Sequence, residues 1–177
     1  TGIARNVSKA TARPGLTLKA ADATDAHALA EILQGHDLVV SSTPFVGGID
    51  APTLIAAAKQ AGVKRVIVVG GAGSLEVAPG VALIDTPEFP AIYKAEASGG
   101  RAFLQTLRTE RELDWTFISP SAFFEPGPRT GRFRLGGDQL LVDADGKSHI
   151  SMEDYAIALA DEIETPRHAR TRFTVGY

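Results

Sequence analysis

The chain has 177 residues, the usual length of one domain. Hydrophobic residues make up 44% and charged residues 22% of it, which excludes a disordered or fibrous protein and leaves material for one sizeable core. Eighteen basic and 21 acidic side chains give a net charge of −3, so the basic excess typical of a nucleic-acid-binding protein is missing. The absence of cysteine excludes disulfides and thiolate catalysis and fits a reducing, cytoplasmic compartment.

Strand and helix patterns alternate through the N-terminal half of the chain. The clearest strand is Arg65–Val69, because an unalternating β-branched run is typical of a strand buried on both faces of a parallel sheet. Apolar runs of this length are far too short to cross a bilayer, so we expect no membrane partner. The other expected elements are a strand end at Thr1–Ala4, strands at Leu16–Ala20 and Asp37–Ser42, and helices at Ala26–Leu33 and Asp50–Ala61.

The alternation continues in the C-terminal half, after a loop over residues 70–90 whose length is typical of a functional or mobile segment. Ser151 and Asp154 form a capping pair that predicts a helix start. The expected elements are a helix from Pro90 to about Arg108, strands at Trp115–Ser119, Arg132–Leu135 and Gln139–Asp143, a helix at Met152–Ile163, and an edge strand at Thr171–Val175.

Repeated β–α units predict an α/β fold, with a doubly wound, mostly parallel sheet and helices on both faces. We expect residues 1–177 to form a single domain. Because the chain opens on a strand end with no methionine or helix before it, we also expect a preceding strand–helix pair, on the order of 30 residues. The alternative is that Thr1 follows a removed methionine. Ligands of this fold lie beyond the carboxyl ends of the strands, so candidate site residues are sought there.

Two charged residues follow the first two predicted strands. In a dinucleotide-binding fold, a basic residue at the position of Arg5 accommodates a ribose 2′-phosphate, so Arg5, helped by Lys9 or Arg13, favours NADP over NAD. Asp22 could accept a hydrogen bond from an adenine amino group. The structural alternatives are a solvated loop arginine and, for Asp22 or Asp25, a cap of the following helix.

Small residues end two further strands. Ser41–Phe45 would let backbone approach a cofactor, with Phe45 packed near a ring, or would form an ordinary turn. Gly70–Ser74 contains three glycines, which allow a planar ring or a phosphate to lie against backbone. Ser74 is then placed to hydrogen-bond a substrate carbonyl or a nicotinamide carboxamide. This run is not the G-x-G-x-x-G phosphate-binding motif.

Tyr93 and Lys94 open the long helix and are candidate catalytic residues, because a nearby cation lowers the pKa of a phenol that donates a proton. Side chains share a helix face at i,i+3 or i,i+4 spacing, whereas adjacent ones diverge by roughly 100°. The residue four positions after Tyr93 is Ala97, so the usual proton-relay pair is absent. Either residue could still line a site, or be solvated.

The last candidate segment, Ser119–Phe124, leaves a buried strand, and its two phenylalanines could form one wall of an apolar pocket or pack as core or lid. The four histidines are scattered without ligand spacing, so no metal site is expected. Arg129, Arg132 and Arg134 indicate a solvated basic strip that an anionic substrate could use.

These segments together resemble one family. The resemblance rests on Ile3–Asn6, Ala21–Asp25, Val66–Ser74, Trp115–Pro120 and His149–Ala156, and it covers essentially the whole chain. The chain is similar to atypical short-chain dehydrogenase/reductase proteins with a Rossmann-like fold, in the NAD(P)H-binding group provisionally assigned as NADH–flavin reductases and the biliverdin-IXβ-reductase-like enzymes. The glycine-rich loop between the family's first strand and helix has no counterpart in this sequence.

The resemblance implies a role for residues at each strand end. It implies that Arg5 and Asp22 contact the adenosine end of the cofactor and that Thr43 and Pro44 lie along it. The residues expected around the nicotinamide are Gly71, Ala72, Gly73, Ser74, Tyr93, Pro120, Ser121 and Ala122.

The missing proton relay bears on the reaction. Reducing a ketone produces an alkoxide and benefits from a positioned acid, whereas a conjugated acceptor spreads the charge and can take its proton from solvent. We therefore expect an NADPH-dependent reductase of a flavin, quinone or tetrapyrrole-like acceptor, acting as a monomer or homodimer, with NAD as a possible cofactor. The alternatives are a non-catalytic NAD(P) sensor acting through a protein partner and, with less support, a sugar-nucleotide epimerase or dehydratase.

Overall fold

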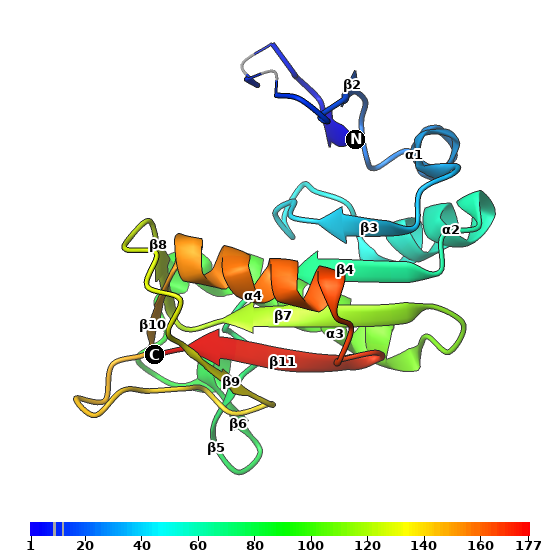
Figure 1. Cartoon of the computed structure of the whole chain (residues 1–177). Helices are drawn as coiled ribbons and strands as arrows, with labels where there is room; N and C mark the ends of the chain where they lie inside the picture. The colour runs from blue at the N-terminus through cyan, green and yellow to red at the C-terminus, as the bar shows by residue number, and fades with distance from the viewer. Residues whose placement is uncertain (9, 12) are drawn as a thin grey trace.

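The computed structural model describes residues 1–8, 10–11 and 13–177. Its centre is a five-stranded sheet in the order β3-β4-β7-β11-β9, in which the first four strands are parallel and β9 is antiparallel (Figure 1). The strands are β3 (Leu38–Ser41), β4 (Arg65–Val69), β7 (Asp114–Pro120), β9 (Arg134–Gly136) and β11 (Thr171–Gly176).

Helices cover both faces of this sheet, which confirms the predicted α/β class (Figure 1). Residues of β4 alternate between the two cores: Val66 and Val68 pack in one cluster and Ile67 in the other, each no more than 1% exposed. The first cluster takes in α1 (Ala26–Leu33), α2 (Ala51–Ala61) and α3 (Lys94–Thr109), and the second takes in α4 (Met152–Glu164). Burial on both faces explains the unalternating strand sequences.

Capping residues define the ends of the helices, and Asp25 is one of the two caps that the sequence offered for α1. Asp25 accepts hydrogen bonds from the amides of His27 and Ala28 at the start of α1, and Asp50 accepts one from Thr53 at the start of α2. Gly62 follows α2 with a φ of 77°, the left-handed conformation that favours glycine.

Three smaller sheets flank the main one. Strands β1 (Gly2–Ala4) and β2 (Leu18–Ala20) pair in parallel, as do β8 (Phe123–Glu125) and β10 (His149–Ser151). The long loop contains an antiparallel hairpin, β5 (Glu76–Ala78) with β6 (Val81–Ala82), and the 3₁₀ turn η1 (Leu83–Asp85). A second turn, η2 (Ala91–Tyr93), leads into α3, so the predicted helix is α-helical only from Lys94.

Two strand predictions are wrong. Residues 139–143 form no strand, because only Gln139 bridges to Glu76; Leu141 packs its side chain where a Cβ on Gly136 or Gly176 would lie. Strand β11 is not an edge strand, because β9 pairs with its outer side. Among the described residues no helix is long and apolar enough to cross a membrane.

Candidate functional site

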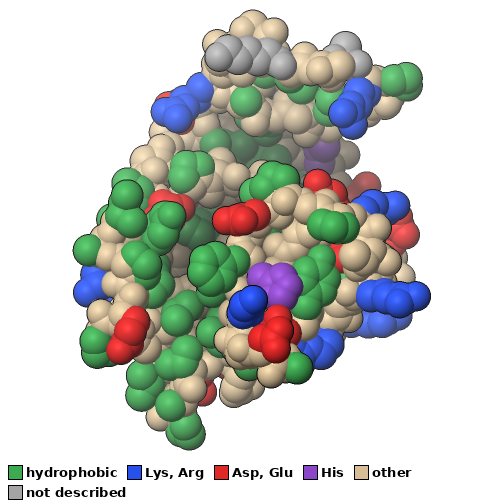
Figure 2. All heavy atoms as spheres, turned by 90° about the vertical axis from the view of Figure 1, so that its left-hand side faces the viewer, with side chains coloured by type: hydrophobic (Ala, Val, Ile, Leu, Met, Phe, Trp, Pro, Cys, Tyr) green, Lys and Arg blue, Asp and Glu red, His purple; other side chains and the backbone are tan. Residues whose placement is uncertain are grey.

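A cavity of about 630 Å³ opens at the carboxyl ends of the parallel strands. Figure 2 views this edge, where hydrophobic side chains gather around a hollow and acidic side chains lie among them. The volume falls within the roughly 300–1,000 Å³ of small-molecule sites. The cavity is lined by the glycine run after β4, by the start of α3 and by β8; its aromatic members are Phe45, Phe89, Tyr93, Phe123 and Phe124.

Gly70, Gly71 and Gly73 bring bare backbone to the cavity, and each lacks a side chain for its own reason. A Cβ on Gly70 would overlap the Phe117 ring, and the Gly70 amide donates to the Ile118 carbonyl at 2.8 Å, which ties the end of β4 to β7. A Cβ on Gly73 would lie 2.6 Å from the Ala97 Cβ, so glycine is required by packing against α3. A Cβ on Gly71 would contact only Phe45 Cε2, at 4.0 Å, so packing does not explain glycine there. Gly71 therefore leaves open the space that a ligand ring would fill.

Ser74 is held by the buried side chain of Arg172, a residue that was not predicted from the sequence. The Arg172 side chain is 2% exposed, and its Nη1 lies 3.3 Å from both Ser74 Oγ and Ser119 Oγ. Its Nε donates to Asp138 Oδ1 at 2.7 Å, and burial lowers its pKa. Because a guanidinium can only donate, Ser74 Oγ accepts from it and keeps its own O–H to donate elsewhere.

The loop after β3 is fastened to α3. Glu96 accepts hydrogen bonds from the amides of Phe45 at 2.6 Å and Val46 at 2.9 Å. Phe45 packs against two glycines of α3: a Cβ on Gly99 would lie 2.9 Å from the Phe45 Cβ, and a Cβ on Gly100 would lie 3.0 Å from the Phe45 ring. Of the predicted residues just before it, Thr43 is half-buried and Pro44 is exposed, and neither lines the cavity.

Tyr93 and Lys94 take different positions. Tyr93 lines the cavity and is 60% exposed, whereas Lys94 is exposed and is not among the lining residues. The residue that shares the cavity wall four positions after Tyr93 is Ala97. Within residues 1–8, 10–11 and 13–177, no lysine lines the cavity beside the phenol.

Another wall of the cavity is formed by β8 and by Ala122, the residue two positions after β7. Ala122, Phe123 and Phe124 line the cavity, but Ser121 is 1% exposed and donates to the Val175 carbonyl at 3.1 Å, and Pro120 is buried in β7.

Phe124 is supported from behind by the buried Tyr155, whose ring centroid lies 4.8 Å away. The Tyr155 hydroxyl donates to the Ile118 carbonyl at 2.9 Å, and burial raises its pKa far above the ordinary value. A phenol held in this way is a structural group rather than a proton donor.

The predicted adenosine-end residues lie on the β1–β2 unit, away from the cavity lining. Arg5 and Asp22 are both exposed. Hydrogen bonds from the Thr24 amide and hydroxyl lower the pKa of Asp22, with a smaller contribution from Arg5. Asp22 thus closes a turn, while Asp25 caps α1. Lys9 lies outside the described residues.

Two buried carboxylates outside the cavity hold loops in place. Asp154 accepts hydrogen bonds from the Thr130 amide, the Gly131 amide and the Tyr177 hydroxyl, each at 2.8 Å. Burial acts to raise the pKa of Asp154, but these hydrogen bonds outweigh it and the pKa is lowered. Glu162, at the opposite end of α4, accepts from the His168 ring at 2.7 Å, and its pKa is likewise lowered against the effect of burial.

The parallel sheet, the helices on both faces and a glycine-lined cavity at the strand ends define a dinucleotide-binding α/β domain. A comparison with protein families agrees with this class: the family model described as NAD(P)H-binding matches residues 1–166. The chain belongs to this NAD(P)H-binding family.

Individual relatives are similar over much of the chain. The uncharacterized protein YwnB of Bacillus subtilis is 50% identical over 125 residues, which are 69% of this chain and 59% of YwnB. A solved structure of a Burkholderia pseudomallei protein, provisionally described as exported, is 47% identical with a TM-score of 0.87, covering 99% of this chain and 85% of that one.

Two further solved structures carry provisional enzyme names. A Bacteroides thetaiotaomicron protein named provisionally as an epimerase is 42% identical with a TM-score of 0.93, covering 99% of this chain and 83% of that one. A Streptococcus pneumoniae protein named provisionally as an NADH–flavin reductase is 32% identical with a TM-score of 0.82, covering 98% of this chain and 85% of that one.

Proposed function

We propose that this protein is an NADPH-dependent reductase that transfers a hydride to a flat conjugated acceptor, such as a flavin, a quinone or a tetrapyrrole. The observation that carries the proposal is the cavity itself, which has bare glycine backbone on one wall, aromatic rings on the others and, among the described residues, no lysine in its lining. Such a site suits stacking of planar rings better than proton donation to a ketone. The provisional flavin-reductase name of the Streptococcus relative supports the same class of acceptor.

The residues present fit a nicotinamide. Gly71, Ala72 and Gly73 would hold its ring against backbone, and the open space beside Gly71 is the strongest sign of this. The free O–H of Ser74 is available for its carboxamide. Arg5 would accommodate the 2′-phosphate, which is the basis for proposing NADPH rather than NADH.

The chain's own part in the reaction is positioning. When bound, NADPH would supply a hydride to the acceptor, whose accompanying proton would come from solvent. Phe123 and Phe124 stack the acceptor, while Phe45, fixed by Glu96, closes the far side of the nicotinamide pocket. Arg172 positions Ser74 without touching the reactants. By holding the two rings in contact and excluding water, these residues would make hydride transfer faster than it is between the free molecules in solution.

The direct test is oxidation of NADPH, followed at 340 nm, by the full-length protein with riboflavin, FMN, quinones and biliverdin. We expect turnover with at least one acceptor. Gly71→Ala should weaken NADPH binding by about tenfold, which corresponds to 1.4 kcal/mol, because the methyl group occupies ring space. No turnover across this panel, together with unchanged NADPH affinity in Gly71→Ala, would contradict the proposal.

The cofactor preference has its own test. Arg5→Asp should lower the affinity for NADPH relative to NADH, because the carboxylate repels a 2′-phosphate and accepts from a 2′-hydroxyl. Calorimetric titration of both cofactors measures the ratio, with Arg13→Asp as a control of equal charge change. An unchanged ratio would mean that Arg5 does not contact the phosphate.

A second candidate is a non-catalytic NAD(P) sensor that acts through a protein partner, and the lack of a lysine four positions after Tyr93, where the chain has Ala97, favours it. Tight nucleotide binding without turnover of any acceptor would support the sensor. The epimerase name of the Bacteroides relative predicts instead turnover of a nucleotide sugar, which the same assays can include.

A further inference from the structure

Two carboxylates at the cavity are left without partners. Glu88 and Glu125 both line the cavity, and within the part of the chain that the structure describes neither forms a hydrogen bond or an ion pair. Both side chains belong to exposed residues. They therefore present uncompensated negative charge to any molecule that enters.

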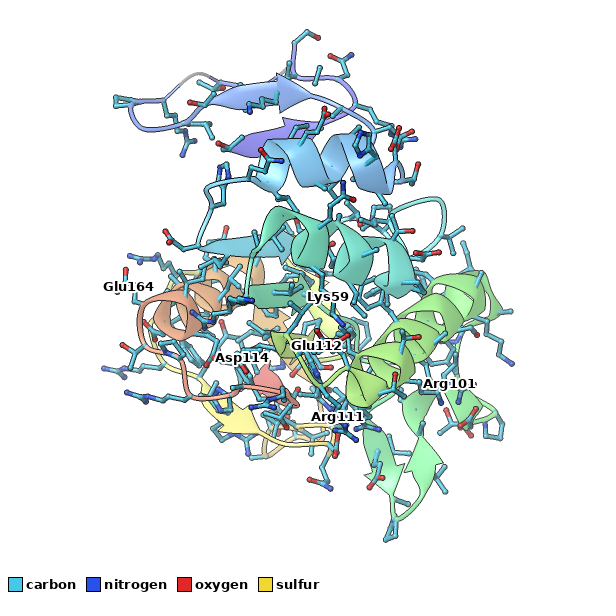
Figure 3. The ribbon with its side chains drawn as sticks, turned by 90° about the vertical axis from the view of Figure 1, so that its right-hand side faces the viewer. Lys59, Arg101, Arg111, Glu112, Asp114 and Glu164 are labelled. Carbon is cyan, nitrogen blue, oxygen red and sulfur yellow. The ribbon has the colours of Figure 1, made fainter. Side chains whose placement is uncertain are left out.

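The other two charged lining residues do not offset them. The Arg101 guanidinium, on α3 (Figure 3), donates to both oxygens of Asp85, at 2.9 and 2.8 Å. The Glu96 carboxylate is bound by two loop amides. Among the described residues that line the cavity, Arg101 is the one cation and is already paired, so three carboxylates against one guanidinium leave an excess of negative charge.

The two free carboxylates adjoin the aromatic wall. Glu88 immediately precedes Phe89, and Glu125 ends β8 directly after Phe123 and Phe124. A ring stacked on these side chains would bring its substituents close to the carboxylates. Charges interact over roughly 8 Å at physiological ionic strength, so a charged substituent on such a ring would feel carboxylates that line the same cavity.

We propose that the cavity selects flat acceptors that carry no negative charge, such as neutral quinones or riboflavin, over acceptors with phosphate or carboxylate groups, such as FMN or biliverdin. This inference rests on the proposed reductase function and narrows its substrate class. Like charges brought together at the exposed mouth of a cavity disfavour binding and slow association, and the effect is largest at low ionic strength.

Riboflavin and FMN test this directly, because they share one ring system and differ in a phosphate. With saturating NADPH at low ionic strength, we expect kcat/KM for riboflavin to exceed that for FMN by roughly tenfold or more, and the ratio to shrink as salt is added. An FMN value equal to or above that of riboflavin would overturn the inference and leave the reductase proposal standing.

Charge variants identify the source of the selectivity. The double variant Glu88→Gln/Glu125→Gln should narrow the riboflavin-to-FMN ratio to about threefold or less. The control is Glu112→Gln/Glu164→Gln, which removes the same formal charge at the opposite edge of the sheet, where both residues are exposed and Glu112 pairs with Lys59 (Figure 3). The control should keep the wild-type ratio, and an equal narrowing in both would overturn the inference.

A binding measurement that needs no turnover distinguishes failure of the charge selectivity from failure of the reductase proposal. Quenching of flavin fluorescence measures the affinity of the same variants for riboflavin and FMN without turnover. Stronger binding of riboflavin, with no NADPH oxidation by any acceptor, would retain the selectivity and contradict the reductase function. Equal affinity for both flavins in the absence of turnover would contradict both proposals.

Discussion

Gly73→Ala tests whether the contact between the glycine run and α3 sets the geometry of the cavity. An ideal Cβ on Gly73 would lie 2.6 Å from the Ala97 Cβ. Carbon atoms pack at about 3.5–4.0 Å, so the loop and the helix would have to separate by roughly 1 Å. Ala97 has no flexible side chain that could move aside.

This overlap sets the expected loss in the free energy of unfolding. Inserting a methyl group into a packed contact destabilises by about 1–3 kcal/mol, which for a chain of this size lowers Tm by roughly 3–10 °C. Ala97→Gly removes the clashing methyl group at about 1 kcal/mol in helix propensity. The double variant Gly73→Ala/Ala97→Gly should therefore be more stable than the sum of the two single effects predicts, by about 1–2 kcal/mol.

Urea unfolding followed by circular dichroism would measure the free energy of unfolding for each variant. Gly71→Ala is the control: its Cβ meets no clash and its φ is not positive, so its stability should stay within about 0.5 kcal/mol of wild type. The reasoning is refuted if Gly73→Ala is as stable as Gly71→Ala, or if Ala97→Gly adds its full cost to that of Gly73→Ala.

The remaining predictions concern the two buried carboxylates. Asp154→Ala should lower the free energy of unfolding by about 2–4 kcal/mol, because it leaves the Thr130 and Gly131 amides without acceptors; urea unfolding would show a change below 1 kcal/mol if water replaces the carboxylate. The lowered pKa of Glu162 means that its stabilising effect is complete above its ordinary pKa of 4.5 and is lost as pH falls through the folded-state value. Stability measured from pH 6 to pH 3 should therefore fall less steeply in Glu162→Gln, and an identical slope would show that Glu162 does not contribute.

Much of the main sheet could be predicted from local sequence. The strand Arg65–Val69 and the helices Ala26–Leu33 and Ala51–Ala61 agree with their predicted ranges to within a residue, because their hydrophobic patterns and capping residues are local. The order of the five strands and the antiparallel β9 could not be predicted from local sequence, because the pairing joins Leu135 to Val175, 40 positions later.

The short strands β8 and β10 escaped prediction for the same reason. Each has three residues, too few for a periodic pattern, and they pair Phe123 with His149. Residues 139–143 carry an apolar run like that of a strand, but Leu141 uses it to fill the space beside two glycines rather than to form a ladder.

The role of Arg172 at the site could not be predicted from local sequence. An arginine within Thr171–Gly176 suggests an exposed position, yet the strand is buried on both faces, and its guanidinium depends on Asp138, 34 residues earlier. A charged residue inside an otherwise buried strand is the signal that could have indicated a partner. The cavity residues Gly71–Ser74, Tyr93 and Ala122 were accessible to prediction because they follow strands or open a helix.

The two aromatic walls of the cavity are anchored to different parts of the molecule. Phe45 is fixed to α3 through Glu96, whereas Phe124 rests on Tyr155 of α4 across the sheet. The gap between the walls therefore depends on how thick the hydrophobic layers on the two sides are. Changes in core side chains beneath either helix can retune which planar molecules fit, without altering any residue that touches them.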